Sequence, residues 1–118
     1  MYGLPKNIDL SFFAGCNLDQ ICIGPGDLIL RFSGNLSLNI YGDLTYEEIK
    51  HPPKCFPCHP HTSCVLIKLL NCSVVKAEPA SDGSLLLVFS NGDSITIHDS
   101  NQGYESYLIQ HGDKTVVI

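Results

Sequence analysis

Alternation of apolar and polar residues recurs along the chain and predicts short β-strands. The clearest case is 93–98, where Ile95 and Ile97 alternate with polar residues, as is typical of a sheet with one solvated face. The preceding turn Asn91–Gly92 is a strong hairpin signal, because both residues tolerate a positive φ. The other predicted strands are 17–23, 27–32, 35–41, 73–78, 84–89, 104–110 and 115–118.

Two further segments, 9–15 and 62–71, are predicted to be short helical or turn segments, and the second is the clearer helix. In the second segment the apolar residues recur at a spacing that places them on one helical stripe. These residues are Val65, Leu66, Leu69 and Leu70. Together the elements predict an α+β fold, in which antiparallel β meanders carry one or two short helices on one face.

The two halves of the chain resemble each other in sequence. The run 28–33 lies 57 positions before the matching run 85–90, and Tyr46–Glu47 lies 58 positions before Tyr104–Glu105. The order of the matches agrees along both halves, and the drift in spacing falls where turns are predicted. We therefore interpret the chain as a duplicated β-rich unit.

One domain of 118 residues is expected to hold both copies, because a chain of this length supports a single hydrophobic core. The pseudo-repeats cover about 9–50 and 62–110. A loop rich in cysteine, histidine and proline joins them at 51–64.

The composition excludes a disordered chain and argues against nucleic acid as a partner. Hydrophobic residues make up 44% of the chain, which is enough for a core, and charged residues make up 16%. Seven basic residues against 12 acidic ones give a net charge of −5, and Arg31 is the single arginine. Nucleic-acid recognition needs a basic face. An acidic surface instead favours a protein partner with a basic surface.

The chain is expected to be cytoplasmic and to contact no membrane. Its first residues show no basic stretch followed by an apolar run, and apolar runs such as 85–89 are far shorter than a membrane span. In a reducing compartment the six cysteines are expected to be buried thiols, metal ligands or redox centres rather than disulfides.

The segment 51–64 is predicted to be a loop, because a proline-rich stretch cannot form a central strand. Its Cys-x2-Cys spacing would let one turn present two sulfurs to a zinc ion. The candidate ligands are Cys55, Cys58, Cys64 and either His59 or His61. The alternatives are a plain loop with incidental cysteines and histidines, and a redox pair formed by the two cysteines of the Cys-x-Pro-Cys run.

No specific catalytic constellation is recognisable in the sequence. It contains neither a phosphate-binding Gly-rich loop nor a Gly-x-Ser-x-Gly nucleophile elbow. His98–Asp99 with Glu105 is an acid–base candidate, but residues of these types are ordinary in the turn that follows a strand. We therefore expect a binding protein rather than an enzyme.

Several runs resemble an uncharacterised family of small bacterial α+β proteins. The likeness is carried by the Phe-x-Asn-Gly turn within 85–99, by Tyr104-Glu105-Ser106-Tyr107, and by the runs 18–24 and 28–32. It covers most of the chain, whereas the loop 51–64 departs from it. The family has no assigned catalytic residues. Proteins of similar size, acidity and mixed make-up often serve as immunity partners of bacterial toxins, so the resemblance implies a role of that kind.

The first functional hypothesis is therefore an acidic immunity- or inhibitor-type module that covers a basic cleft of another protein. Asp99 and Glu105 would contribute charge to this surface. Tyr104 and Tyr107 lie three positions apart in a predicted strand and point to opposite faces, so one of them is expected in the core and the other at the interface.

Two alternative hypotheses are kept. The chain, or a homodimer of it, would bind or sequester a small molecule such as a nucleotide signal at the junction of its halves, as some phage-encoded proteins do. The cations for an anionic ligand would be Arg31, Lys68 and Lys76, of which Arg31 breaks the apolar pattern of its match Val88. The last hypothesis is a zinc-stabilised structural protein.

Overall fold

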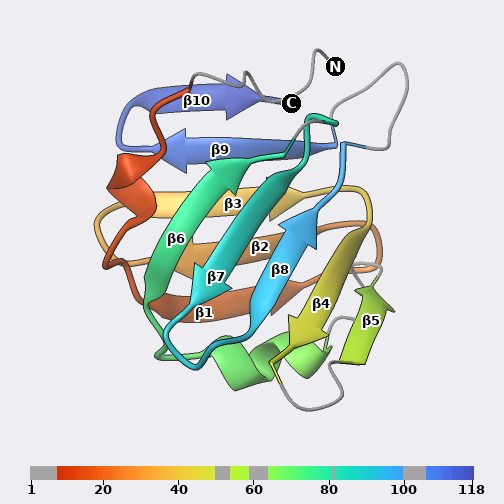
Figure 1. The fold of residues 1–118 in the computed structure, drawn as a ribbon. Helices are drawn as coiled ribbons and strands as arrows, with labels where there is room; N and C mark the ends of the chain where they lie inside the picture. Colours follow the sequence, from red (N-terminus) through yellow and green to blue (C-terminus); the bar gives the residue numbers. More distant parts are fainter. Residues whose placement is uncertain (1–7, 50–53, 59–63, 81, 100–105) are drawn as a thin grey trace.

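The protein is almost entirely β-structure in the computed structural model, so the predicted α+β fold is wrong (Figure 1). Strands hold 53% of the described residues and short helices 9%, and none of those helices reaches seven residues. The structure describes residues 8–49, 54–58, 64–80, 82–99 and 106–118, with the backbone alone for 54–58 and 64.

Within the described residues, ten strands form two five-stranded antiparallel sheets that pack face to face. Sheet 1 has the order β1 (Leu18–Ile23), β2 (Leu28–Phe32), β3 (Leu36–Ile40), β9 (Tyr107–His111) and β10 (Lys114–Val117). Sheet 2 has the order β5 (Lys54–Cys58), β4 (Leu44–Glu48), β8 (Ser94–Ile97), β7 (Leu85–Phe89) and β6 (Val74–Pro79). The prediction of antiparallel meanders is confirmed by β1-β2-β3 and by β6-β7-β8.

The two halves of the chain interlock through their last two strands. Each half supplies a three-stranded meander to one sheet and then sends its fourth and fifth strands to the other sheet. Exchanging β1–β5 with β6–β10 converts the strand order of sheet 1 into that of sheet 2. Each sheet therefore needs strands from both halves. Common ancestry of the halves stays a prediction, whereas their topological equivalence is a property of the fold.

The halves meet at an antiparallel bridge between Asn17 and Ser73. On one side of this bridge the Leu18 amide donates a hydrogen bond to the Cys72 carbonyl at 3.0 Å. On the other side the Val74 amide donates to the carbonyl of the residue before Asn17 at 2.9 Å. The two hydrogen bonds join equivalent pairs of residues, so each one becomes the other when the two halves of the chain are swapped.

The strand register corrects one detail of the sequence comparison. Tyr46 lies opposite Ile95 in sheet 2, as Ile109 lies opposite Leu38 in sheet 1. The equivalent of Tyr46 is therefore Ile109, and Tyr104, which lies outside the described residues, is not its counterpart. The shift arises because the connection between β8 and β9 is longer than that between β3 and β4.

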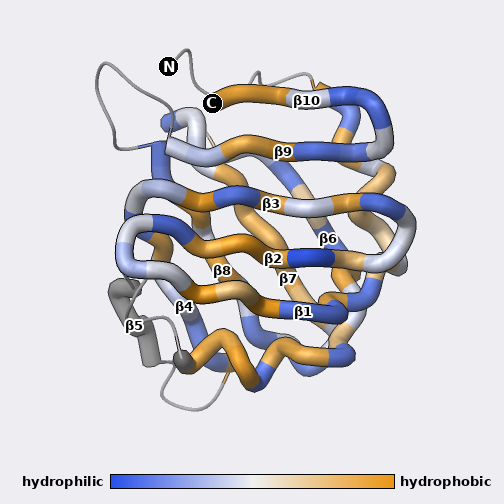
Figure 2. The backbone as a smooth tube through the Cα atoms, turned by 180° about the vertical axis from the view of Figure 1, so that it is seen from behind, coloured by the Kyte–Doolittle hydropathy of each residue, from blue (hydrophilic) through white to orange (hydrophobic). Residues whose placement is uncertain are grey.

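The core lies between the sheets and is built from alternate residues of the strands. In β2 and β3 every second residue is buried, and the positions between them face outwards. Figure 2 shows sheet 1 from its outer side, where hydrophilic and hydrophobic positions are mixed along the strands. The largest fully buried side chains include Phe13, Tyr46, Phe89 and Tyr107.

The predicted helices are short 3₁₀ turns. The segment 62–71 contains η3 (Cys64–Leu69) and the segment 9–15 contains η1 (Ser11–Phe13). A 3₁₀ turn aligns residues three apart, so Leu66 and Leu69 are buried. The other two residues of the predicted stripe, Val65 and Leu70, are more exposed to solvent. No helix in the described part of the chain combines the length and apolar character that a membrane crossing requires.

The segment 51–64 is not simply a loop, because it contains the strand β5, and β4 before it was not predicted at all. Proline is nevertheless accommodated as expected for a sheet. Pro57 lies opposite Thr45 on an edge strand, where its missing N–H interrupts no central ladder. The edge position is thus what permits a strand in this proline-rich stretch.

Candidate functional site

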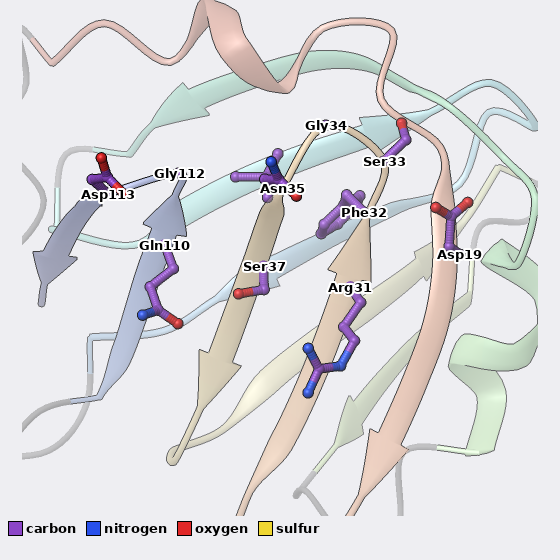
Figure 3. A pocket seen from close by; sticks show the side chains of 11 residues that line it. Asp19, Arg31, Phe32, Ser33, Gly34, Asn35, Ser37, Gln110, Gly112 and Asp113 are labelled. Carbon is purple, nitrogen blue, oxygen red and sulfur yellow. The ribbon is translucent and has the colours of Figure 1, made fainter.

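The outer face of sheet 1 carries a cavity of about 620 Å³ beside the β2–β3 turn (Figure 3). We call it the Arg31 groove. Its polar side chains are Asp19, Arg31, Ser33, Asn35, Ser37, Gln110 and Asp113.

Three of these side chains are placed by strand register. Arg31 lies opposite Ser37, and Ser37 lies opposite Gln110, so the three residues form a line across β2, β3 and β9. Each follows a buried core residue and therefore faces outwards. Residues directly opposite each other have Cβ atoms about 5 Å apart. Gln20 on β1 and Thr115 on β10 extend the line across the whole sheet.

Most of the polar lining of the groove makes no contact within the described part of the protein. Ser33 Oγ accepts a hydrogen bond from the Asn17 amide at 3.1 Å, whereas the other six polar side chains make neither hydrogen bonds nor ion pairs with described residues. Thr45 and His98, by contrast, are hydrogen-bonded to each other at 2.8 Å. The unpaired groups of the groove are therefore available to a ligand.

The three predicted ligand-binding cations do not converge. Lys68 Nζ lies 2.5 Å from Glu48 Oε1, and Lys76 Nζ lies 3.5 Å from Glu78 Oε1 in the other sheet. Neither lysine lines the groove. Arg31 is the member of this set that faces the groove without a protein partner among the described residues.

The equivalent line of sheet 2 has different chemistry. Val88 lies opposite Ser94, which lies opposite Glu47. Valine thus stands where sheet 1 has Arg31, and a carboxylate stands where sheet 1 has Gln110. The cation of this line is Lys76, which lies opposite Val88 on the edge strand β6 where sheet 1 has Gln20, and it is paired with Glu78.

The equivalent turn of sheet 2, between β7 and β8, is filled by Ile49. A Cβ added to Gly92 in this turn would lie 2.8 Å from Ile49 Cδ1, whereas a Cβ added to Gly34 in the β2–β3 turn would have Cys16 Sγ as its nearest neighbour, at 3.9 Å. The Asp93 carboxylate in the filled turn accepts hydrogen bonds from the Tyr46 hydroxyl at 2.5 Å and the Ile49 amide at 3.1 Å. The β2–β3 turn beside the groove thus lacks the close side-chain contact that Ile49 makes with the β7–β8 turn.

Burial changes the acid–base properties of the side chains around Asp93 in the filled turn. Loss of solvation, followed by the hydrogen bond to Asp93, raises the pKa of Tyr46 above its ordinary value. Glu48 is buried and bound to Lys68, so its carboxylate is not a surface charge. These groups stabilise the fold rather than form an accessible site.

The predicted protein-interaction residues are only partly described. Tyr104 and Glu105 lie outside the described residues. Tyr107 is fully buried, and its hydroxyl donates to the Gly83 carbonyl at 3.0 Å, so it is the core member of the tyrosine pair. Asp99 is half-buried and accepts a hydrogen bond from Ser106 Oγ at 3.1 Å. An acidic interface there stays a prediction.

The side chains of the predicted zinc ligands also lie outside the part of the protein that the structure describes. His59 and His61 lie outside it, as do the side chains of Cys55, Cys58 and Cys64. The backbone at Cys55 and Cys58 is extended in β5 rather than folded into the turn that the zinc hypothesis assumed. Among side chains that the structure does describe, no three His, Cys, Asp or Glu groups are arranged to hold a metal ion. Zinc binding stays a prediction.

A second cavity, of about 430 Å³, lies on the inner side of β9 and β10. Its walls include Ile109, Val116 and the ring of Phe12, which stacks on His111 with centroids 4.6 Å apart. Its acidic residue Asp9 is already hydrogen-bonded to the Ser11 amide at 3.0 Å. Lys114 also lines this cavity, but the cavity has fewer polar side chains than the Arg31 groove.

Comparisons of the chain with protein-family models, with curated proteins and with solved structures return no match. The resemblance to a bacterial immunity-type family thus stays a prediction. A function for this protein has to be argued from the geometry of the Arg31 groove.

Proposed function

We propose that the protein binds a small organic anion in the Arg31 groove. The observation that carries this proposal is an arginine without a protein partner that faces a polar cavity of about 620 Å³. A guanidinium offers five N–H donors in a planar fork that matches a carboxylate or a phosphate. Cavities of roughly 300–1,000 Å³ are typical of small-molecule sites.

The proposal concerns binding and not catalysis. The described residues that line the groove include no histidine, cysteine or lysine, and its carboxylates are treated as ligand-binding groups. Ser37 and Gln110 on the strands next to Arg31 can donate and accept hydrogen bonds, which is the chemistry of recognition.

A solvated polar face without a ligand is the competing interpretation. The comparison between the two sheets favours a site, because the cation on the equivalent line of sheet 2, Lys76, lies on an edge strand and is paired with Glu78. Arg31 instead lies beside a cavity and has no such pair among the described residues.

The test is an NMR titration of the ¹⁵N-labelled protein with sodium acetate and, separately, inorganic phosphate. We expect shifts concentrated at amides of β2, β3 and β9, with half-saturation on the order of 1 mM for such small probes. Arg31→Val introduces the residue that the other half carries and should abolish the shifts. Lys76→Gln removes a cation elsewhere and should preserve them. Shifts that persist in Arg31→Val, or no localised shifts in the wild type, would refute the proposal.

A further inference from the structure

Resting on the proposed function, we infer that the ligand is a monocarboxylate that carries hydrogen-bond donors beside its carboxylate, rather than a phosphate or a nucleotide. This ligand class follows from the two aspartates that share the groove with Arg31, Asp19 and Asp113.

The charge of the lining selects against multiply charged anions. One arginine (+1) and two aspartates (−2) give the charged lining a net charge of −1. A phosphate dianion would meet one cation and two like charges, and like charges brought together oppose binding. A carboxylate fills both arms of the guanidinium fork while it brings a single negative charge.

The aspartates also specify what surrounds the carboxylate. An ionised carboxylate is an acceptor only, so the ligand groups that face Asp19 and Asp113 must be donors. Neither aspartate accepts a hydrogen bond or forms an ion pair within the described part of the protein. Hydroxyl groups and an ammonium group both meet this requirement. The chemistry therefore points to a sugar acid or to an amino acid.

The placement of the aspartates requires donors in more than one direction. Asp19 is on β1, to one side of Arg31, and Asp113 is in the turn after β9, on the other side (Figure 3). Between them Ser37 and Gln110 act as donors or acceptors. Such a lining suits a ligand with several polar groups around one carboxylate.

The experiment compares affinities measured by the same NMR titration, at about pH 8, where phosphate is mainly dianionic. The probes are acetate, inorganic phosphate, D-glucose, three sugar acids (D-glucuronate, D-galacturonate and D-gluconate) and the amino acid L-serine. We expect a sugar acid or serine to bind about tenfold more tightly than acetate, because added hydrogen bonds to a charged partner contribute roughly that factor. Phosphate should bind more weakly than acetate, and glucose should not bind.

A double variant tests the role of the aspartates directly. Asp19→Asn with Asp113→Asn changes two exposed side chains without altering their size, so the fold should be unaffected. We expect it to reduce the advantage of the sugar acid or serine over acetate, and to raise the affinity for phosphate above that of the wild type.

The outcomes separate this inference from the proposed function. If acetate causes localised shifts that depend on Arg31, but phosphate binds more tightly than acetate or no sugar acid or amino acid exceeds acetate, the ligand class is wrong and the anion site stands. If no anion causes such shifts, both fail. Tighter binding of the sugar acids than of serine identifies hydroxyl donors, and the reverse order identifies an ammonium.

Discussion

Phe32 and Phe89 stack on each other across the two sheets, with ring centroids 6.4 Å apart and ring planes at 18°. The two residues occupy equivalent positions, at the ends of β2 and β7, and both are buried. Equivalent residues from the two halves of the chain therefore contact each other in the core between the sheets.

This contact predicts that the two rings are energetically coupled. Phe32→Leu and Phe89→Leu should each destabilise the protein, and the double variant should lose less than the sum of the two. A stacked pair contributes roughly 0.5–1.5 kcal/mol beyond the area it buries. Urea unfolding of the wild type, both single variants and the double variant measures this coupling. Strict additivity would show that the stack carries no energy of its own.

The two buried tyrosines provide a matched test of hydrogen-bond strength. The Tyr46 hydroxyl donates to the carboxylate of Asp93, whereas the Tyr107 hydroxyl donates to the backbone carbonyl of Gly83. Tyr46→Phe should lower the free energy of unfolding by about 1.5–3 kcal/mol, and Tyr107→Phe by about 0.5–1.5 kcal/mol, because bonds to charged groups are stronger. Chemical denaturation measures both losses, and an equal or reversed order would contradict the assignment.

Alkaline pH should weaken the ion pair between Lys68 and Glu48. The hydrogen bond to Glu48 raises the pKa of Lys68 above its ordinary value of 10.5. Because the folded protein holds this proton more tightly than the unfolded chain, the stabilisation is complete below pH 10.5 and is lost as pH rises through the folded-state pKa.

Lys68→Met should therefore be less stable than the wild type at about pH 8, and the difference should shrink at the alkaline end of the range. Lys76→Met is the control, because Lys76 and Glu78 form an exposed ion pair that contributes little. Thermal unfolding across the pH range measures the differences. A gap between wild type and Lys68→Met that stays constant with pH would show that the lysine acts through packing instead.

The turns that follow the two 3₁₀ helices use the same backbone conformation with different residues. Gly15 has a φ of +80° and Asn71 has a φ of +66°. Asn71→Gly should be close to neutral, whereas Asn71→Ala should cost about 1 kcal/mol, because a Cβ without a local polar group is disfavoured in the left-handed region. Unfolding by urea distinguishes the variants. Equal stability of the glycine and alanine variants would contradict the predicted strain.

Arg31 is predicted to be dispensable for the fold. It is exposed on β2 and makes no contact with a charged partner among the described residues, and valine is favoured in strands. Arg31→Val should change the free energy of unfolding by less than about 0.5 kcal/mol, or raise it slightly. A large destabilisation would mean that Arg31 serves the sheet, and loss of anion binding in this variant would then be uninformative.

The residues of the groove illustrate what sequence patterns omit. Arg31 stood out because it interrupts the apolar pattern that Val88 continues. The alternation within each strand could have shown that Ser37 and Gln110 face outwards. Only the pairing of β3 with β9 places these two residues in one line, and that pairing joins segments about 70 positions apart in the sequence.

The sequence alone determined the two meanders and most of their turns, because alternation of apolar residues and turns such as Asn91–Gly92 act over a few neighbouring positions. It did not reveal β4, whose run Leu44–Glu48 is short and partly charged, nor the edge strand β5 in a proline-rich segment. Tertiary structure decided that the halves exchange their last two strands, because only that exchange completes both sheets. It also decided that Ile49 contacts the β7–β8 turn at Gly92, since β4 and β8 pair in sheet 2 although they are distant in the sequence.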